Sequence, residues 1–120
     1  MFSKKMEYGY IILKKLETTS REKTKLGKEI LEDTKVPHSM GLSILTELSN
    51  AGLIISTKGK NGGFFLAKEK IYFLDLFVAL EINQKNKSIL QNKVKEDEEY
   101  DRKVKRIGKI LLEALGRVQI

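Results

Sequence analysis

The sequence predicts a mainly α-helical protein with one small β-hairpin, an α+β arrangement, followed by a long C-terminal helix. Two observations support this prediction. Apolar residues recur at helical spacing in several segments of the chain. A glycine-rich cluster joins two short runs of apolar and β-branched residues, as in a hairpin. We expect one domain over residues 1–82, a linker over residues 83–92 and a helix over residues 93–120.

The first two predicted helices are amphipathic and cover residues 6–18 and 26–33. Between them, residues 18–24 are polar and aperiodic, which predicts a surface loop. Each helix has an apolar stripe that we expect to face the core. The stripes consist of Met6, Tyr10, Ile12, Leu13 and Leu16 in the first helix and of Leu26, Ile30 and Leu31 in the second.

The third predicted helix covers residues 37–50 and begins at Pro37, which disfavours helix in the preceding residue and suits a first helical turn. Gly52 stands just past the expected end, where glycine is common. We therefore expect a turn between the second and third helices. The apolar side of the third helix is predicted to hold Met40, Ile44, Leu45 and Leu48, and the opposite side His38, Ser39, Leu42, Ser43 and Thr46.

A β-hairpin is predicted next, because residues 53–58 and 64–67 are rich in apolar and β-branched side chains and a glycine cluster separates them. A phosphate-binding nucleotide loop is an alternative for such a cluster. It is discounted because the trailing Gly-Lys-Ser/Thr is missing and the cluster joins two strands. We expect the glycines to supply positive φ and room for close approach. The tip of the hairpin is basic and polar, with Lys58, Lys60 and Asn61.

Two further helices complete the chain. Residues 71–82 are very apolar and predict a short helix whose Leu74, Phe77, Val78 and Ala79 point inward. After the linker, a long charged helix has apolar residues at alternating steps of three and four, the spacing of a helix–helix seam. An exposed stripe of this length seeks a partner, so we expect a homodimer held by this dimerisation helix. The seam consists of Val104, Ile107, Leu111, Ala114 and Val118.

The composition points to a polyanionic partner. The chain of 120 residues has 23 Lys and Arg against 16 Asp and Glu, a formal net charge of +7, with most of the excess in residues 1–70. Neutralised phosphates release counterions, so basic domains commonly bind nucleic acid, although such a charge can also serve solubility alone. No apolar run is long enough to span a bilayer and no signal peptide is evident. We expect a cytoplasmic protein without membrane contact.

The chain has no cysteine and one histidine. It can therefore form no disulfide and no cysteine-ligated iron–sulfur cluster, and we expect no cofactor. No residues fall in a recognisable catalytic motif, so an enzyme is not expected. The acidic residues Asp97, Glu98, Glu99 and Asp101 are an alternative hard-cation site, but such a run at a helix start is usually a solvated face that suits the helix dipole.

The order helix, helix, turn, helix and basic hairpin is typical of a winged helix-turn-helix, whose last helix enters the major groove of double-stranded DNA. Hydroxyl side chains can donate to phosphates or bases, and lysines neutralise phosphates. The alternative is a winged helix used only for protein–protein interaction, which would lack the steep salt dependence of DNA binding. The candidate DNA-binding residues are His38, Ser39, Ser43, Thr46, Lys58, Lys60 and Asn61.

Residues 51–67, with the sequence AGLIISTKGKNGGFFLA, resemble the wing signature of the Rrf-two family of bacterial transcription regulators. The resemblance covers about residues 8–81 in all. It continues forward through Ile71, Asp75 and the run Ala79, Leu80 and Glu81, and backward through Val36, Ile30, Glu29, Leu26 and Tyr8.

The resemblance implies a homodimeric regulator, expected to be a repressor, that binds a palindromic operator. It places the third helix in the major groove, the wing at the minor groove and the C-terminal helices in a pair. Departures from the family pattern occur at Pro37, Gly41, the pair Leu42 and Ser43, and Phe64, so base specificity does not carry over. The family's contact positions correspond to Ser39, Leu42, Ser43, Lys58, Gly59, Lys60, Asn61, Gly62 and Gly63.

Sensing is where the sequence departs furthest from the family. Members that bind an iron–sulfur cluster carry three cysteines before the dimerisation helix, and residues 83–100 have none. The resemblance therefore implies regulation without a cluster, by a small molecule or partner protein acting on residues 73–100. A constitutive DNA-binding protein with no effector is the alternative.

Overall fold

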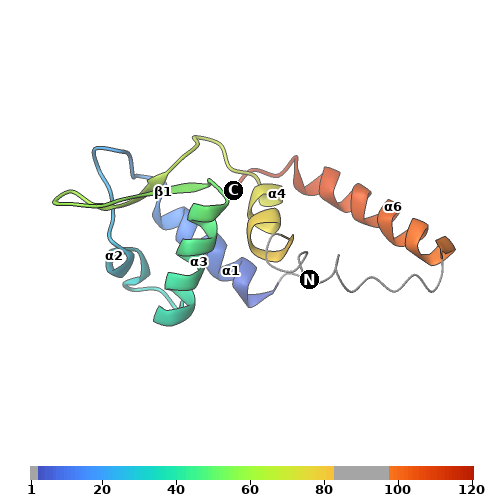
Figure 1. Ribbon diagram of the computed structural model, residues 1–120, viewed down its shortest axis with the longest axis horizontal. Helices are drawn as coiled ribbons and strands as arrows, with labels where there is room; N and C mark the ends of the chain where they lie inside the picture. The colour runs from blue at the N-terminus through green and yellow to red at the C-terminus, as the bar shows by residue number, and fades with distance from the viewer. Residues whose placement is uncertain (1–2, 83–97) are drawn as a thin grey trace.

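The computed structural model describes residues 3–82 and 98–120. It confirms the predicted fold class, with helices around a single two-stranded antiparallel hairpin (Figure 1). The π-helical turn η1 continues α4 directly. The elements in order are α1 (Lys4–Lys15), α2 (Gly27–Leu31), α3 (His38–Asn50), β1 (Ile54–Thr57), β2 (Gly63–Leu66), α4 (Phe73–Phe77), η1 (Val78–Ile82) and α6 (Glu98–Leu115).

The hydrophobic core lies where α1, α3 and the segment formed by α4 and η1 meet, with α2 and β1 closing its other end. Aliphatic side chains dominate it. Burying each of them stabilises the fold by about 1.5–3 kcal/mol relative to leaving it exposed. The largest fully buried side chains are Ile12, Leu13, Leu16, Ile30, Ile44, Leu45, Leu48, Ile54, Leu76 and Leu80.

Helix starts are fixed by side chains that satisfy backbone N–H groups. The hydroxyl of Ser3 accepts from the backbone N–H of Met6 at the start of α1. At α2 the carboxylate of Glu29 accepts from the backbone N–H of Leu26, 3.1 Å away. At α4 the carboxylate of Asp75 accepts in the same way from Tyr72, 2.8 Å away. Glu29 and Asp75 therefore have a structural role at helix N-termini.

The inward side of α3 differs from the prediction at one position. Ile44, Leu45 and Leu48 are buried as expected, but Met40 is 42% exposed and Gly41 is buried instead. The reason is steric: a Cβ on Gly41 would lie 2.5 Å from Leu31 Cδ2. The backbone of α3 thus contacts α2 directly there, which rotates Met40 outward.

The hairpin pairs Ile54 with Leu66 and Thr57 with Gly63. A third segment extends it, because the N–H of Lys25 donates to Phe64 O at 3.0 Å and the N–H of Phe64 donates to Lys25 O at 2.7 Å. This pairing attaches the hairpin to the chain just before α2. The hairpin and α2 consequently form one end of the molecule (Figure 1).

The predicted helix over residues 71–82 exists as α4 and η1, but its inward residues were assigned wrongly. Leu76 and Leu80 are the fully buried side chains, together with Ala79 as expected, whereas Leu74, Phe77 and Val78 are half-buried. The reason is the packing against α1: a Cβ on Gly9 would lie 2.6 Å from Leu80 Cδ1 and 2.9 Å from Leu76 Cδ1. The close approach to this glycine turns Leu76 and Leu80 toward the core.

The C-terminal helix α6 extends away from the winged-helix body, which gives the molecule extents of 55 × 28 × 24 Å (Figure 1). The expected linker, residues 83–92, and the expected helix start at residue 93 lie outside the described residues. Unlike the prediction, the helix ends at Leu115. The following segment turns back, so that the N–H of Phe73 donates to Val118 O at 2.8 Å and the N–H of Ile120 donates to Ile71 O at 2.8 Å.

Candidate nucleic-acid interface

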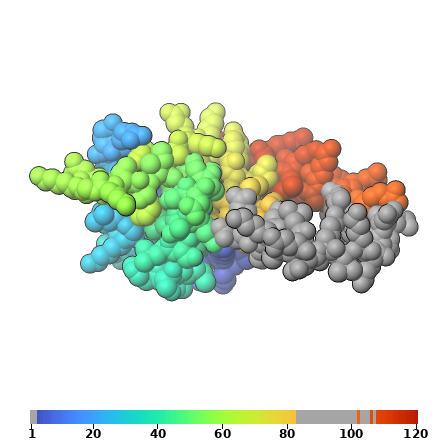
Figure 2. All heavy atoms as spheres, viewed as in Figure 1, coloured from blue at the N-terminus to red at the C-terminus, as the bar shows by residue number. Residues whose placement is uncertain are grey.

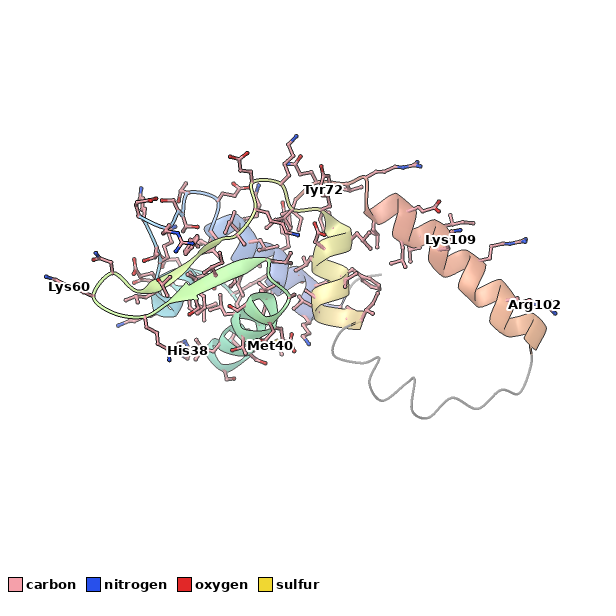
Figure 3. The ribbon with its side chains drawn as sticks, turned by 45° about the horizontal axis from the view of Figure 1, so that its top comes forward. His38, Met40, Lys60, Tyr72, Arg102 and Lys109 are labelled. Atoms are coloured by element: carbon pink, nitrogen blue, oxygen red, sulfur yellow. The ribbon has the colours of Figure 1, made fainter. Side chains whose placement is uncertain are left out.

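The outward side of α3 carries all the residues that the sequence predicted for it. His38, Ser39, Ser43 and Thr46 are exposed, and Leu42 is 42% exposed. They face outward because the opposite side of the helix is buried against α1 and α2. Figure 3 shows His38 and Met40 on this helix with their side chains in view.

Thr46 has a narrower chemical role than the sequence suggested. Its hydroxyl donates to the backbone carbonyl of Leu42, 3.1 Å away, so its single proton is used inside the helix. What it offers outward is a methyl group and oxygen lone pairs. Ser39 and Ser43 remain as hydroxyl groups suited to donate to phosphates or bases.

The tip of the hairpin, here called the wing tip (residues 58–63), projects beyond the body as a narrow finger (Figure 2). Lys58, Lys60 and Asn61 are exposed there. Within the part of the chain that the structure describes, neither lysine has a carboxylate partner. Their charges are therefore available to an external anion.

Backbone constraints explain the glycines of the wing tip. Gly59 and Gly63 have φ of 104° and 148°, the region that favours glycine. At Gly62 a Cβ would lie 2.7 Å from Thr57 O, and at Gly63 it would lie 2.7 Å from Lys25 O. The hydroxyl of Thr24 also donates to Asn61 O at 3.0 Å, which ties the wing tip to the loop before α2.

Gly27, which the sequence did not mark, is the point where α2, α3 and the hairpin meet. A Cβ there would lie 3.2 Å from Leu42 Cδ2 and 3.8 Å from Phe64 Cε2. Leu42 of α3 and Phe64 of the hairpin therefore both lie beside this residue of α2. The family motif includes the neighbouring Leu26, but no spacing rule points to this glycine.

Other charged groups hold the helices in place. Lys5 pairs with Glu47 of α3 at 2.8 Å, and Lys35, just before α3, pairs with Glu7 of α1. Hydrogen bonds from Lys35 and Lys4 lower the pKa of Glu7, and the Glu7 carboxylate raises the pKa of Lys35. One ion pair joins α1 to α3 and the other joins α1 to the turn before α3, so these lysines serve packing more than external binding.

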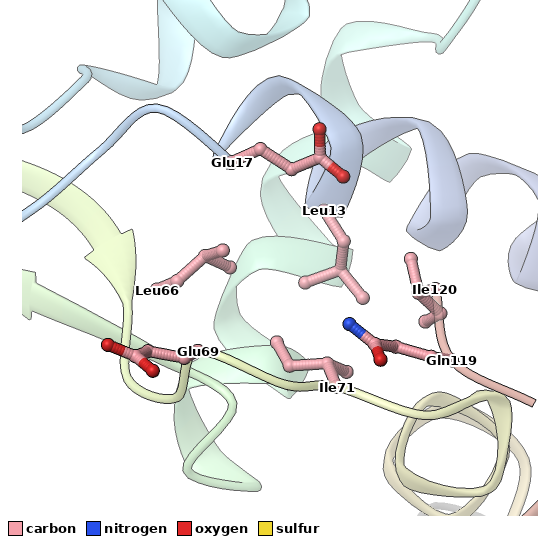
Figure 4. A pocket seen from close by; sticks show the side chains of 7 residues that line it. All are labelled: Leu13, Glu17, Leu66, Glu69, Ile71, Gln119 and Ile120. Atoms are coloured by element: carbon pink, nitrogen blue, oxygen red, sulfur yellow. The ribbon is translucent and has the colours of Figure 1, made fainter. Parts of the chain in front are cut away.

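A small cavity lies away from this surface, between α1, the end of β2 and the C-terminal segment (Figure 4). Its volume is about 50 Å³, whereas sites for small molecules usually measure about 300–1,000 Å³. It is therefore too small for an organic cofactor. It is lined by Leu13, Glu17, Leu66, Glu69, Ile71, Gln119 and Ile120.

The predicted dimerisation residues fall into three groups. Leu111 and Ala114 are exposed on α6, while Val118 is exposed but lies beyond the helix end, in the segment that pairs with residues 71–73. The side chains of Val104 and Ile107 lie outside the described part of α6. None of the described helices combines the length and apolar character needed to cross a bilayer.

A comparison with protein-family models matches residues 2–119 to the Rrf2 (Rrf-two) family, described as an iron-dependent transcriptional regulator. This chain belongs to the Rrf2 family. Rrf2 proteins are DNA-binding transcription regulators and not enzymes. The family resemblance of the sequence is thereby confirmed, and α3 and the wing correspond to the family's winged helix-turn-helix.

Individual proteins similar to this chain agree with the family match. A protein of Aquifex aeolicus (strain VF5), provisionally named an HTH-type transcriptional regulator, is 36% identical over 69 residues, which are 58% of this chain and 47% of that protein. The match thus spans about half the relative's length. CymR (YrzC), the global cysteine regulator of B. subtilis, is 26% identical, with a TM-score of 0.68 over 99% of this chain and 92% of CymR. IscR of T. potens has the same fold, at 24% identity and a TM-score of 0.71 over 99% of this chain and 82% of IscR.

The iron dependence in the Rrf2 description does not fit the donor groups of this chain. No cysteine is present in the sequence, and the single histidine, His38, is exposed on α3. Within residues 3–82 and 98–120, no three His, Asp or Glu side chains come together in a way that could hold a metal ion. A thiolate-ligated iron centre cannot form on such a chain.

Proposed function

We propose that this Rrf2 protein is a sequence-specific DNA-binding transcription regulator that acts as a homodimer without an iron–sulfur cluster. The observation that supports it best is the junction at Gly27, where Leu42 of α3 and Phe64 of the hairpin both approach α2. One rigid unit thereby presents a polar helix face and a cationic wing tip together. Such a pair matches the major groove and the adjacent phosphates of one DNA half-site.

The two parts of this surface have different tasks in the proposal. Lys58 and Lys60 supply affinity that does not depend on sequence, because a lysine is a point charge suited to phosphates. His38, Ser39 and Ser43 contribute to the choice of bases, with Thr46 accepting hydrogen bonds only. Gly59, Asn61, Gly62 and Gly63 let the wing backbone approach the DNA closely.

Dimerisation through α6 is the second part of the proposal. Ile110 and Leu111 are 62% and 39% exposed, and an open apolar groove of about 520 Å³ lies between α4 and α6. Exposed apolar surface of this kind is typical of an interface. A second α6 would cover it and set the distance between two half-sites. The groove is lined by Leu74, Gly108, Lys109, Leu112 and Glu113.

We further propose that the dimer acts in the cytoplasm as a repressor, by occupying an operator that other proteins need. Regulation would come from a small molecule or partner protein that shifts the residues joining η1 to α6. A ligand can do this only if its affinity differs between the two arrangements.

The test is selection of bound duplexes from a random double-stranded library with the purified full-length protein. We expect enrichment of a palindrome, binding that weakens steeply between low and physiological salt, and a dimer in sedimentation at micromolar concentration. A protein-interaction module would enrich no sequence and show no steep salt dependence. Such a result would refute the proposed function.

A further inference from the structure

The recognition side of α3 has no basic residue. The helix reads HSMGLSILTELSN, without lysine or arginine, and its one acidic residue, Glu47, accepts a hydrogen bond from Lys5 at 2.8 Å. Guanine in the major groove is read chiefly by bidentate contacts from arginine or lysine. The helix cannot make that contact, so base selection by α3 must use other chemistry.

Leu42 is the apolar residue that faces outward among the polar candidates of α3. Its side chain is 42% exposed, although a leucine of a core-facing helix is ordinarily buried. One methyl group, Cδ2, lies beside Gly27 of α2, close enough that a Cβ added there would be 3.2 Å away. Leu42 therefore packs against α2 at one end while a large part of it remains open to a ligand.

We propose that Leu42 contacts the C5 methyl group of thymine, so that each half-site requires an A·T pair at that position. This inference rests on the proposed function and adds the base chemistry to it. Thymine is the one base that presents an apolar group in the major groove, and an apolar side chain is its matching contact. Packing of Leu42 Cδ2 beside Gly27 restricts the side chain before DNA binds, so less conformational freedom is lost on binding.

Met40 provides a matched comparison on the same helix. It is also 42% exposed, but it lies about 160° around the helix axis from Leu42, given about 100° per residue. It is on the flank away from Gly27 and the wing. Removing Met40 therefore takes away a similar apolar surface without touching the assigned contact.

The experiment uses the best duplex from the random selection and a series in which each thymidine of one half-site is replaced by deoxyuridine. Uracil pairs with adenine as thymine does but lacks the C5 methyl group. We expect one position at which this exchange weakens wild-type binding about fourfold, the effect of burying one methyl-sized group. Leu42→Ala should bind both duplexes equally, whereas Leu42→Met and Met40→Ala should keep the difference.

Any other result of this experiment contradicts either the Leu42 contact or the proposed function. If no thymidine is sensitive, if Leu42→Ala keeps the fourfold difference, or if Met40→Ala removes it, the assignment of Leu42 is overturned while the regulator function stands. Failure to enrich any duplex refutes the proposed function instead. Thermal melting verifies that Leu42→Ala is folded, and Leu42→Gln, of similar size, replaces it if it is not.

Discussion

Gly41 of α3 packs directly on the side chain of Leu31 at the end of α2. A Cβ on Gly41 would lie 2.5 Å from Leu31 Cδ2 and 2.6 Å from Leu31 Cδ1. Leu31 is 7% exposed and therefore fills the space that a larger residue at position 41 would occupy. This contact sets how closely α2 approaches the recognition helix and explains why a family position that usually holds leucine tolerates glycine here.

The first prediction exchanges the sizes of these two residues. Gly41→Leu should destabilise the protein by at least about 2 kcal/mol through overpacking, and Leu31→Ala by about 2 kcal/mol through a cavity. The double variant should lose less than the sum, by about 1–3 kcal/mol. Urea unfolding measures the free energy of unfolding of the wild type, the two single variants and the double variant. Pairing Gly41→Leu with Leu76→Ala is the control, and equal compensation there would contradict a specific contact.

The second prediction concerns the ion pair between Glu7 and Lys35. Because the folded pKa of Glu7 is lowered from 4.5, its contribution is present above pH 4.5 and is lost as the pH falls through the folded pKa. Lys35, whose pKa is raised from 10.5, keeps its contribution below pH 10.5 and loses it above the folded pKa. Glu7→Gln should lower the melting temperature slightly at pH 7, and the difference from the wild type should shrink as the pH falls below 4.5. A constant difference across that range would disprove the linkage.

The third prediction compares the positive charge of the wing tip with a positive charge elsewhere on the protein. Lys60→Ala should weaken specific and nonspecific DNA about equally and reduce the salt slope of binding by about one unit. Arg102→Ala removes the same charge from α6 at the other end of the molecule (Figure 3) and should leave the slope unchanged. DNA titrations at several salt concentrations measure the slope for each variant. An unaltered slope for Lys60→Ala would exclude a phosphate contact by this residue.

The fourth prediction tests the backbone of the hairpin. Gly63 combines φ of 148° with a Cβ position only 2.7 Å from Lys25 O. Gly63→Ala should cost about 1–3 kcal/mol of strain, together with the clash, and should loosen the pairing between Lys25 and Phe64. Gly52→Ala is the control, because Gly52 has φ of 79° but no neighbour within 4 Å of the added Cβ. Equal losses of stability in the two variants would show that the close approach is unimportant.

The fifth prediction addresses the α6 surface. Leu111→Glu should convert the dimer into a monomer at micromolar concentration and weaken operator binding strongly, since a buried carboxylate without a partner is costly. Arg102→Glu places the same group about 180° around the helix from Leu111, at another exposed position, and should leave the dimer intact. Sedimentation distinguishes the two. A monomeric wild-type protein would rule out dimerisation through this surface.

The pattern of apolar residues was sufficient to predict the order of elements, because helical and strand periodicities are local properties of the chain. The same locality explains the outward side of α3: once Ile44, Leu45 and Leu48 face the core, Ser39 and Ser43 must face away. The basic wing tip followed from its lysines and glycines alone. The inward side of the α4 segment could not be predicted, because it depends on the close approach of Leu76 and Leu80 to Gly9 of α1.

By itself, the sequence determined the fold class, the polar face of α3, the cationic wing and the absence of thiolate ligands, since each depends on residue type and spacing. Only the tertiary structure decided the contacts between segments far apart in the chain. Gly41 against Leu31, Gly27 against Leu42, and the return of residues 116–120 to pair with residues 71–73 belong to this class. Their physical reason is close packing: which side chain fills a given space depends on how whole elements approach one another, and no local pattern encodes that distance.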